Sequence, residues 1–483
     1  PLPGPAAVVE RLHVRTQERI IRRQLRFAAG DTVDTLRIAD AMRRLRQRRY
    51  LADAWLEARP CNADGGVTLT LTTRDAWSTR PEMRLGASGT ATVGLEERNL
   101  FGTGRAASLY VRSSRSRLGL GAMVSDPWVP YTNLTATARV DSYRDGQEWL
   151  ATASTRRFSV FDPWQTELTF TGSTYHATSD TSGTFTREWA NVLVSHVVHT
   201  SPYGVTSLVM GGELARSSLY AGPAQSLLGP ATVLRRFVGL DLGLRRESAS
   251  YDTLSWLLPH HAFADVPTGF EWDAVAGFGT DLATHTPALH ADLWGGRVWT
   301  FERDHVLVAD VWSSGFLQSG AWNAATVRGH VSYFVAAPHG LWQAHVAAER
   351  LFDPDPDVRA LATLDPLLPL FPHDARLAEG ALSASVERDA DLRTLSHSWA
   401  LQGALFGAAS LRNDFASPNP EQLGAAAIGL GLRLAPMRPG RATFRVDVGV
   451  PVARSAAMRR GPYVSVLVVP WLGGIRERDG RLQ

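Results

Sequence analysis

Most of this chain alternates between apolar and polar positions with a period of two, which predicts β-strands that have one apolar face. The clearest case is a pair of runs within residues 426–450. Apolar side chains occupy every second position of each run, and small or charged residues such as Arg433, Arg445 and Asp447 lie between them. Each run has about nine residues, enough to cross a bilayer at barrel tilt. This hairpin favours a membrane barrel, although a soluble sandwich gives the same alternation in shorter strands.

The same alternation recurs through the rest of the chain after an N-terminal segment, between clusters of Gly, Asp, Asn and Pro. Short turns at residues 126–128, 162–164 and 201–204 recur on one side of the strands, as an up-and-down barrel requires. At roughly 24 residues per strand and link, the chain predicts an antiparallel barrel of about 16 strands. The links at residues 248–269 and 352–378 are too long for simple turns, and we expect at least the latter to fold over or into the barrel mouth.

Residues 1–75 follow a different pattern and predict a small α+β domain with the order strand, helix, helix, strand, strand. We expect strands at residues 8–14, 50–59 and 67–73 and the first helix at residues 17–27. The second helix follows the first and is capped by Asp31 or Thr32. The second helix carries an arginine-rich face, which is either solvated or docks a partner. Residues 76–483 form the predicted barrel.

Composition narrows the class of protein. Hydrophobic residues make up 44% of the chain, but no apolar run reaches the length of roughly 18 residues that a membrane helix needs. This excludes a helical membrane protein and leaves a barrel open. Several aromatic residues near strand ends suit interfacial girdles. They are Trp128, Tyr131, Trp149, Trp164, Tyr463 and Trp471. A net charge of +3 is too small to favour nucleic acid as a partner.

Candidate chemistry is sparse. The sequence has no Gly-x-Ser-x-Gly elbow, phosphate loop or HExxH motif, and the single Cys61 cannot form an internal disulfide. His260 and His261 are adjacent, so on a strand they would point to opposite faces. The acidic run at residues 353–357 is either a solvated loop or a calcium site. We expect no enzyme activity, no catalytic residue, no cofactor and no metal site. Because the chain begins at Pro1 without a signal segment, we expect a processed or trimmed form.

A family resemblance enters at residues 94–104, which read GLEERNLFGTG. This segment resembles the first hairpin of Omp85 proteins, the BamA- and TamA-like outer-membrane assembly or translocation family, where a glycine precedes Glu-x-Asn-Leu-Phe-Gly-x-Gly. The Asp-Pro-Trp turns and the hairpin at residues 429–451 are also similar, whereas residues 174–320 match only as generic barrel. The resemblance implies that residues 1–75 form one POTRA-like domain in the periplasm. It implies that residues 76–483 form a transmembrane barrel in the outer membrane of a Gram-negative bacterium.

The family also has a Val-Arg-Gly-Phe or Tyr motif, in a loop tucked inside the barrel, whose arginine pairs with acidic residues of the inner wall. Val327, Arg328, Gly329 and His330 resemble this motif, and Glu349 occupies the place of one wall acid. No carboxylate occurs near residues 406–408, where the second would fall. A guanidinium held against the wall needs a partner, because burial of an unpaired charge costs free energy.

The resemblance implies protein insertion or translocation, and the sequence suggests a physical route at the seam where the first and last strands meet. The predicted first strand, residues 85–93, is rich in small residues that pack weakly. The predicted last strand ends at a proline, which cannot donate a hydrogen bond to a ladder. An open seam would offer unpaired backbone groups to a client strand. The candidate seam residues are Gly86, Gly89, Tyr463, Ser465 and Pro470.

The partners implied are outer-membrane lipid, unfolded outer-membrane or secreted client proteins, and periplasmic or lipoprotein accessory subunits held by the POTRA-like domain. Insertion into the bilayer and secretion through the lumen both remain open. The alternative function is a passive or substrate-specific outer-membrane channel, which predicts a fully bonded seam. A barrel enzyme is a further alternative, and it would need a carboxylate, a histidine and a serine clustered at the extracellular rim.

Overall fold

The computed structural model describes residues 14–470 except at 26, 47, 49, 62–65, 76–77, 86–90, 115–116, 130–131, 133, 145, 156–161, 178–182, 222–231, 258–263, 303, 353–379, 397–398, 414–421, 437–441 and 456–460. The strand predicted at residues 8–14, apart from its last residue, lies outside the described residues. The same holds for the long link predicted at residues 352–378, apart from its first residue.

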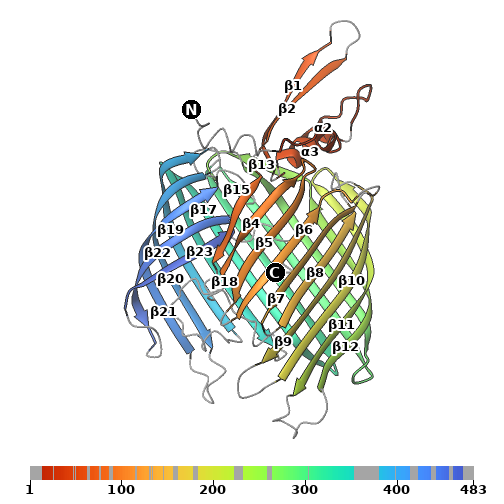
Figure 1. Ribbon diagram of the computed structural model, residues 1–483, viewed down its shortest axis with the longest axis vertical. Coiled ribbons are helices and arrows are strands. Elements are labelled where there is room, and N and C mark those ends of the chain that lie inside the picture. The colour runs from red at the N-terminus through yellow and green to blue at the C-terminus, as the bar shows by residue number, and fades with distance from the viewer. Residues whose placement is uncertain are drawn as a thin grey trace, which may run out of the picture.

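The described residues form a closed antiparallel β-barrel with an N-terminal unit at one end (Figure 1). The wall begins with β3 (Thr79–Leu85), β4 (Ala91–Leu100), β5 (Arg105–Ser114), β6 (Arg117–Asp126), β7 (Leu134–Tyr143), β8 (Gly146–Thr155), β9 (Trp164–Ala177), β10 (Gly183–Ser201), β11 (Gly204–Ala221), β12 (Thr232–Ser248) and the short β13 (Ser250–Leu254). It continues with β14 (Ala264–Asp281), β15 (Thr286–Phe301), β16 (His305–Gln318), β17 (Ala321–Ala337), β18 (Gly340–Phe352), β19 (Gly380–Ser396), β20 (Trp399–Asn413), β21 (Gln422–Pro436), β22 (Ala442–Arg454) and β23 (Tyr463–Pro470). Neighbours in the barrel follow chain order, and β23 lies beside β3.

The barrel prediction is confirmed, but the number of strands is larger than predicted. The barrel order contains 21 strands from β3 to β23. Since β12 and β13 both pair with β14 and share one wall position, 20 positions remain in the described part of the chain rather than about 16. The estimate assumed too many residues per strand and link. The five strands β4 to β8 have ten residues each, and links such as that between β17 and β18 are tight.

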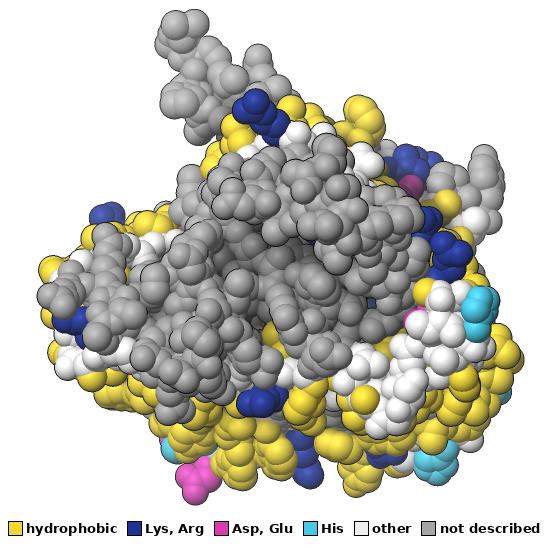
Figure 2. Space-filling model, turned by 90° about the horizontal axis from the view of Figure 1, so that it is seen from below, with side chains coloured by type: hydrophobic (Ala, Val, Ile, Leu, Met, Phe, Trp, Pro, Cys, Tyr) yellow, Lys and Arg dark blue, Asp and Glu magenta, His cyan; other side chains and the backbone are white. Residues whose placement is uncertain are grey.

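The outer face of the barrel is apolar and the inner face is polar, as the alternation predicts. On β21, Ile428, Leu430 and Leu432 point outward and are 52–65% exposed, whereas Arg433, the residue after Leu432, is 2% exposed. The register pairs Leu430 with Val448 of β22, so the predicted hairpin within residues 426–450 is confirmed. Figure 2, seen from the end opposite the N-terminal unit, shows hydrophobic side chains along the outer rim of the barrel. So much exposed apolar surface is unstable in water and indicates a lipid environment.

The tight turns predicted on one side of the strands do lie at one end of the barrel. Strand direction alternates from β3 onward, which places the links β4–β5, β6–β7, β8–β9 and β10–β11 at the end that carries the N-terminal unit. These links contain the two Asp-Pro-Trp sequences and residues 201–204. We call this end of the barrel the N-terminal mouth.

The N-terminal unit contains α2 (Glu18–Arg22), α3 (Thr35–Arg46), β1 (Leu51–Pro60) and β2 (Val67–Asp75). The helix predicted at residues 17–27 is shorter than expected. Asp34, rather than Asp31 or Thr32, caps α3, because its carboxylate accepts the Arg37 N–H at 3.3 Å. β1 and β2 form a separate two-stranded sheet that projects away from the barrel (Figure 1). Among the described residues, no helix is both long and apolar enough to cross a membrane.

Candidate functional site: the seam, the inner wall and the docked N-terminal unit

Among the described residues, two of the shortest wall strands, β3 and β23, form the seam. β3 has seven residues and β23 has eight, whereas β9 to β12 on the far side of β8 have 14 to 19.

Both seam strands contain a proline, which supplies no N–H to the ladder. Pro81 lies within β3, and Pro470 is the last residue of β23. The prediction of a first strand at residues 85–93 is wrong, because that segment straddles the link between β3 and β4. The true first strand, β3, was not predicted because it contains Pro81, and a proline argues against a strand except at an edge. A proline here is consistent with a strand that behaves as an edge.

The predicted seam residues have different positions. Tyr463 and Ser465 lie in β23 and are 3% and 8% exposed on the inner face, whereas Val464 between them is 66% exposed on the outer face. Gly86 and Gly89 lie outside the described residues.

The segment Val327 to His330 is not a loop, which corrects the prediction. It lies in the middle of β17, where Arg328 is opposite Glu349 of β18 in the register. Val327, Gly329 and Val331 alternate with polar residues, which continues the pattern of the strand before and after this segment. The segment pairs with β16 on one side and β18 on the other, and this pairing keeps it in the wall. The predicted pair nevertheless forms, with Arg328 Nη2 at 3.0 Å from Glu349 Oε1.

Replacing Arg328 with alanine is expected to change the free energy of unfolding by less than about 1 kcal/mol, as for other exposed ion pairs. The Arg328 side chain is 56% exposed, so water already screens its attraction to Glu349. The measurement is the urea midpoint of the detergent-solubilised barrel against wild type. A large loss of stability would contradict the assignment of this pair to a water-exposed position on the inner wall.

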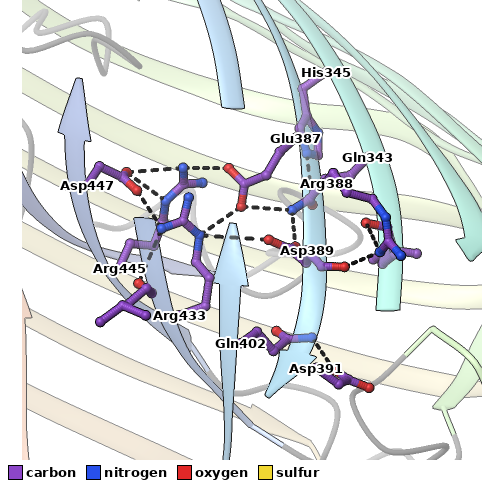
Figure 3. A network of polar contacts seen from close by, with 12 residues as sticks. Gln343, His345, Glu387, Arg388, Asp389, Asp391, Gln402, Arg433, Arg445 and Asp447 are labelled. Carbon is purple, nitrogen blue, oxygen red and sulfur yellow. Dashed lines mark hydrogen bonds and ion pairs between the residues drawn. The ribbon is translucent and has the colours of Figure 1, made fainter. Parts of the chain in front are cut away.

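A buried charge cluster lies elsewhere on the inner wall, on β19, β21 and β22 (Figure 3). Arg433 Nε lies 2.7 Å from Glu387 Oε1, and Arg433 Nη1 also bonds the Asp447 carboxylate. Arg445 Nη2 lies 2.7 Å from Glu387 and 3.2 Å from Asp447. Except for Arg445, at 20%, these side chains are at most 5% exposed. We call these four residues the charge quartet.

Further hydrogen bonds connect the charge quartet to β18 and β17. Gln343 Nε2 donates to Glu387 at 3.2 Å and to Asp389 at 2.7 Å, and its Oε1 lies 3.2 Å from His345 Nε2. Ser332 Oγ then lies 2.6 Å from His345 Nδ1. The network therefore holds the wall from β17 to β22 together, and β22 is the neighbour of seam strand β23.

The sequence contained a signal for the charge quartet that the motif search missed. Arg433, Arg445 and Asp447 were seen as the wet face of a hairpin, but their partner Glu387 lies 46 residues before Arg433. Only the register across β19 to β22 brings them together. Within the described residues, no group of three or more His, Cys, Asp or Glu side chains is arranged to hold a metal ion.

The N-terminal unit is docked on the turn between β4 and β5, the segment that resembles the Omp85 hairpin. Asn99 is fully buried at the end of β4. Its Nδ2 donates to Val14 O at 3.3 Å and to Thr16 Oγ1 at 3.0 Å, and its Oδ1 accepts the Gly104 N–H at 2.8 Å. One side chain thus closes the turn and also holds the start of the N-terminal unit.

Two glycines of this turn allow the close approach. Gly102 and Gly104 both have φ +72°, a conformation that favours glycine. A Cβ on Gly102 would overlap the Arg15 carbonyl oxygen, and a Cβ on Gly104 would lie 2.8 Å from the Tyr50 ring. In addition, the Gln17 N–H donates to Gly102 O at 2.9 Å. Docking therefore explains the asparagine and both glycines of the pattern Asn-Leu-Phe-Gly-Thr-Gly. We call residues 99–104 the docking turn.

The link between β6 and β7 adds an apolar contact. Asp126 accepts the Trp128 N–H at 2.8 Å and orients the indole, which is 8% exposed. Trp128 therefore packs into the core of the N-terminal unit, which corrects its prediction as an interfacial girdle residue. The other buried members of this core are Ile20, Met42, Leu45, Tyr50, Leu51 and Ala54.

No protein-family model matches this sequence, and a search of curated proteins found no match. Similar folds occur among solved structures. CdiB from Escherichia coli is 11% identical, with a TM-score of 0.46 over 93% of this chain and 73% of that chain. BamA from Haemophilus ducreyi lacking POTRA domains 1–3 is 10% identical, with a TM-score of 0.36 over 94% and 82%. The FrpB iron transporter from Neisseria meningitidis is 9% identical, with a TM-score of 0.31 over 82% and 66%.

Proposed function

We propose that this chain is an Omp85-type outer-membrane protein that inserts or translocates other proteins through the seam between β3 and β23. The observation that carries the proposal is the seam itself, where two proline-containing strands that are short within the described residues close the barrel. At most the seven described residues of β3 can pair across it, so parting the seam costs less free energy than parting a long pair such as β10 and β11.

The apolar outer face supports a membrane location for this activity. In lipid, the backbone groups of a parted seam find no water to bind. A client strand that pairs with β3 or β23 satisfies them and is held at bilayer depth.

The docking turn supports a role for the N-terminal unit. It belongs to the hairpin β4–β5, and β4 pairs directly with seam strand β3. Force on the N-terminal unit therefore reaches the seam through one strand. We propose that this unit is a POTRA-like domain in the periplasm of a Gram-negative bacterium. In this position it would receive unfolded clients or hold periplasmic and lipoprotein accessory subunits.

The polar inner wall favours one alternative, a passive or substrate-specific outer-membrane channel. The two functions differ in what the seam must do. A channel conducts with its seam permanently closed, whereas an insertase or translocase that works through the seam must open it.

An enzyme is not part of the proposal, although the inner wall contains an Asp-His-Ser arrangement. Asp310 Oδ2 lies 3.1 Å from His330 Nδ1, and Ser332 Oγ lies 2.8 Å from His330 Nε2. Ser332 is fully buried and also bonds His345. A nucleophile in this position cannot meet a substrate, so these contacts support a structural role.

Locking the seam is expected to stop client insertion. The variants carry Cys61→Ser and a cysteine pair across β3 and β23, reconstituted in liposomes with an unfolded barrel client. Insertion is expected to fall to the rate of empty liposomes on oxidation and to recover on reduction. The reason is that a locked seam leaves no free strand edge with which the client strand can pair. The measurement is the rate at which the client becomes resistant to protease.

The matched control is the pair Val448→Cys and Val464→Cys, which are opposite each other on β22 and β23. This disulfide joins strands that stay paired in either state of the seam, so insertion is expected to continue. If the seam-locked protein inserts clients as fast as its reduced form, the proposal is wrong. A voltage-independent conductance that persists with the seam locked would then favour the channel.

A further inference from the structure

The link between β12 and β14 differs from the tight turns at the N-terminal mouth. β12 pairs with β14 as far as Arg246 opposite Trp272, and β13 then pairs with the first residues of β14 as a separate ribbon. Gly269 has φ +115°, and a Cβ there would lie 2.8 Å from Ser248 Oγ, so the ribbon bends at this point. We call residues 250–257 and 264–268 the mouth ribbon; β13 lies at the end that carries α3 (Figure 1).

The mouth ribbon covers an apolar cluster on the largely polar inner wall. Leu257 and Val266 of the ribbon are 1% and 2% exposed, and Leu254 and Trp256 pack against the same cluster. The wall side of this cluster is the mouth patch. It consists of Val298, Val306, Val308, Phe334 and Leu341. Without the ribbon, this patch would face water in the lumen, which costs about 25 cal/mol for each Å² of apolar surface.

The mouth ribbon also contacts the N-terminal unit. The Arg43 guanidinium of α3 lies 3.7 Å from the centre of the Tyr251 ring, a cation–π contact. On the wall side, Thr300 Oγ1 donates to Asp252 at 2.5 Å, and the Ala249 N–H donates to Tyr203 O at 3.0 Å. The ribbon is thus held from both sides, by the barrel and by the unit that the proposed function assigns to receiving clients.

We propose that the mouth patch is a receiving site for an extended client segment with alternating apolar side chains, and that the mouth ribbon occupies it until the N-terminal unit moves. This inference rests on the proposed function. The ribbon shows which ligand fits, because its strand β13 is extended and brings Leu254 to the patch, and Trp256 packs there from the bend that follows β13. Displacing the N-terminal unit removes the Arg43 contact and thereby lowers the free energy needed to lift the ribbon, which exposes the patch to the client.

The test uses the full chain with Cys61→Ser and a photo-reactive phenylalanine analogue in place of Phe334, which is 1% exposed in the patch. The probe is a synthetic peptide with the sequence of Ala442–Arg454, an extended segment with alternating apolar residues. Cross-linking is expected in the parent protein. It should disappear when Asp252→Cys and Thr300→Cys are oxidised to tether the ribbon, and return on reduction. Tyr251→Ala should increase it about fivefold, the effect of losing one cation–π contact.

Two controls make the result specific. The same photo-reactive residue at Arg328, exposed on the inner wall outside the patch, should react equally with the ribbon tethered or free. A peptide of scrambled sequence should react less at position 334. Equal cross-linking at position 334 in the tethered and free states, or none in either, would overturn the inference. Because peptide binding requires no open seam, these outcomes are independent of client insertion, which tests the proposed function.

Discussion

Replacing Arg433 with leucine is expected to lower the free energy of unfolding of the barrel by about 3–5 kcal/mol, the cost of removing one partner from a buried ion pair. The change leaves the carboxylates of Glu387 and Asp447, 5% and 4% exposed, with Arg445 as their only remaining partner from the quartet. The cost is large because these oxygens cannot reach water instead.

The measurement for this variant is the urea midpoint in detergent, followed by the intrinsic fluorescence of the many tryptophans. Arg328→Leu is the matched control, since it makes the same chemical change on the same inner wall at a side chain that is 56% exposed. We expect only Arg433→Leu to shift the midpoint. Equal midpoints for the two variants would mean that water solvates the charge quartet and that the quartet does not hold β19, β21 and β22 together.

Replacing Asn99 with alanine is expected to release the N-terminal unit from the barrel. The substitution removes the hydrogen bonds to Val14, Thr16 and Gly104 at a fully buried position. Each buried group left without a partner costs about 1–3 kcal/mol, so docking loses several kcal/mol while the barrel wall keeps its ladder.

The measurement for this variant is the distance distribution between spin labels at Thr70 on the β1–β2 hairpin and at Val464 on the outer wall. The distribution should be narrow in the parent protein and broad in Asn99→Ala. Gln17→Ala is the graded control, because it removes one exposed hydrogen bond to the docking turn, at Phe101 O, and one from Arg19 within the unit, and it should leave the distribution narrow. An unchanged distribution in Asn99→Ala would mean that the remaining contacts, including those of Trp128 and Gln17, are sufficient to fix the unit.

Local patterns predicted the site only in part. The pair of Arg328 and Glu349 forms as predicted. The motif around Arg328 was assigned to a loop, because a four-residue match contains no information about which strands the segment pairs with. The docking turn was visible as a family-like segment, yet its role depends on Val14, which lies 85 residues before Asn99. The true first strand was missed because Pro81 breaks the usual strand signal.

By itself, the sequence determined that this protein is an antiparallel barrel with an apolar outside and a polar inside, preceded by a small α+β unit. Alternation of period two and helical spacing are local properties, readable within ten residues. Only the tertiary structure decided the 20 wall positions of the described residues, the identity of β3 as the first wall strand, the charge quartet and the mouth ribbon. Each of these depends on the register between strands distant in sequence, and a shift of one residue would reverse every face without changing the alternation.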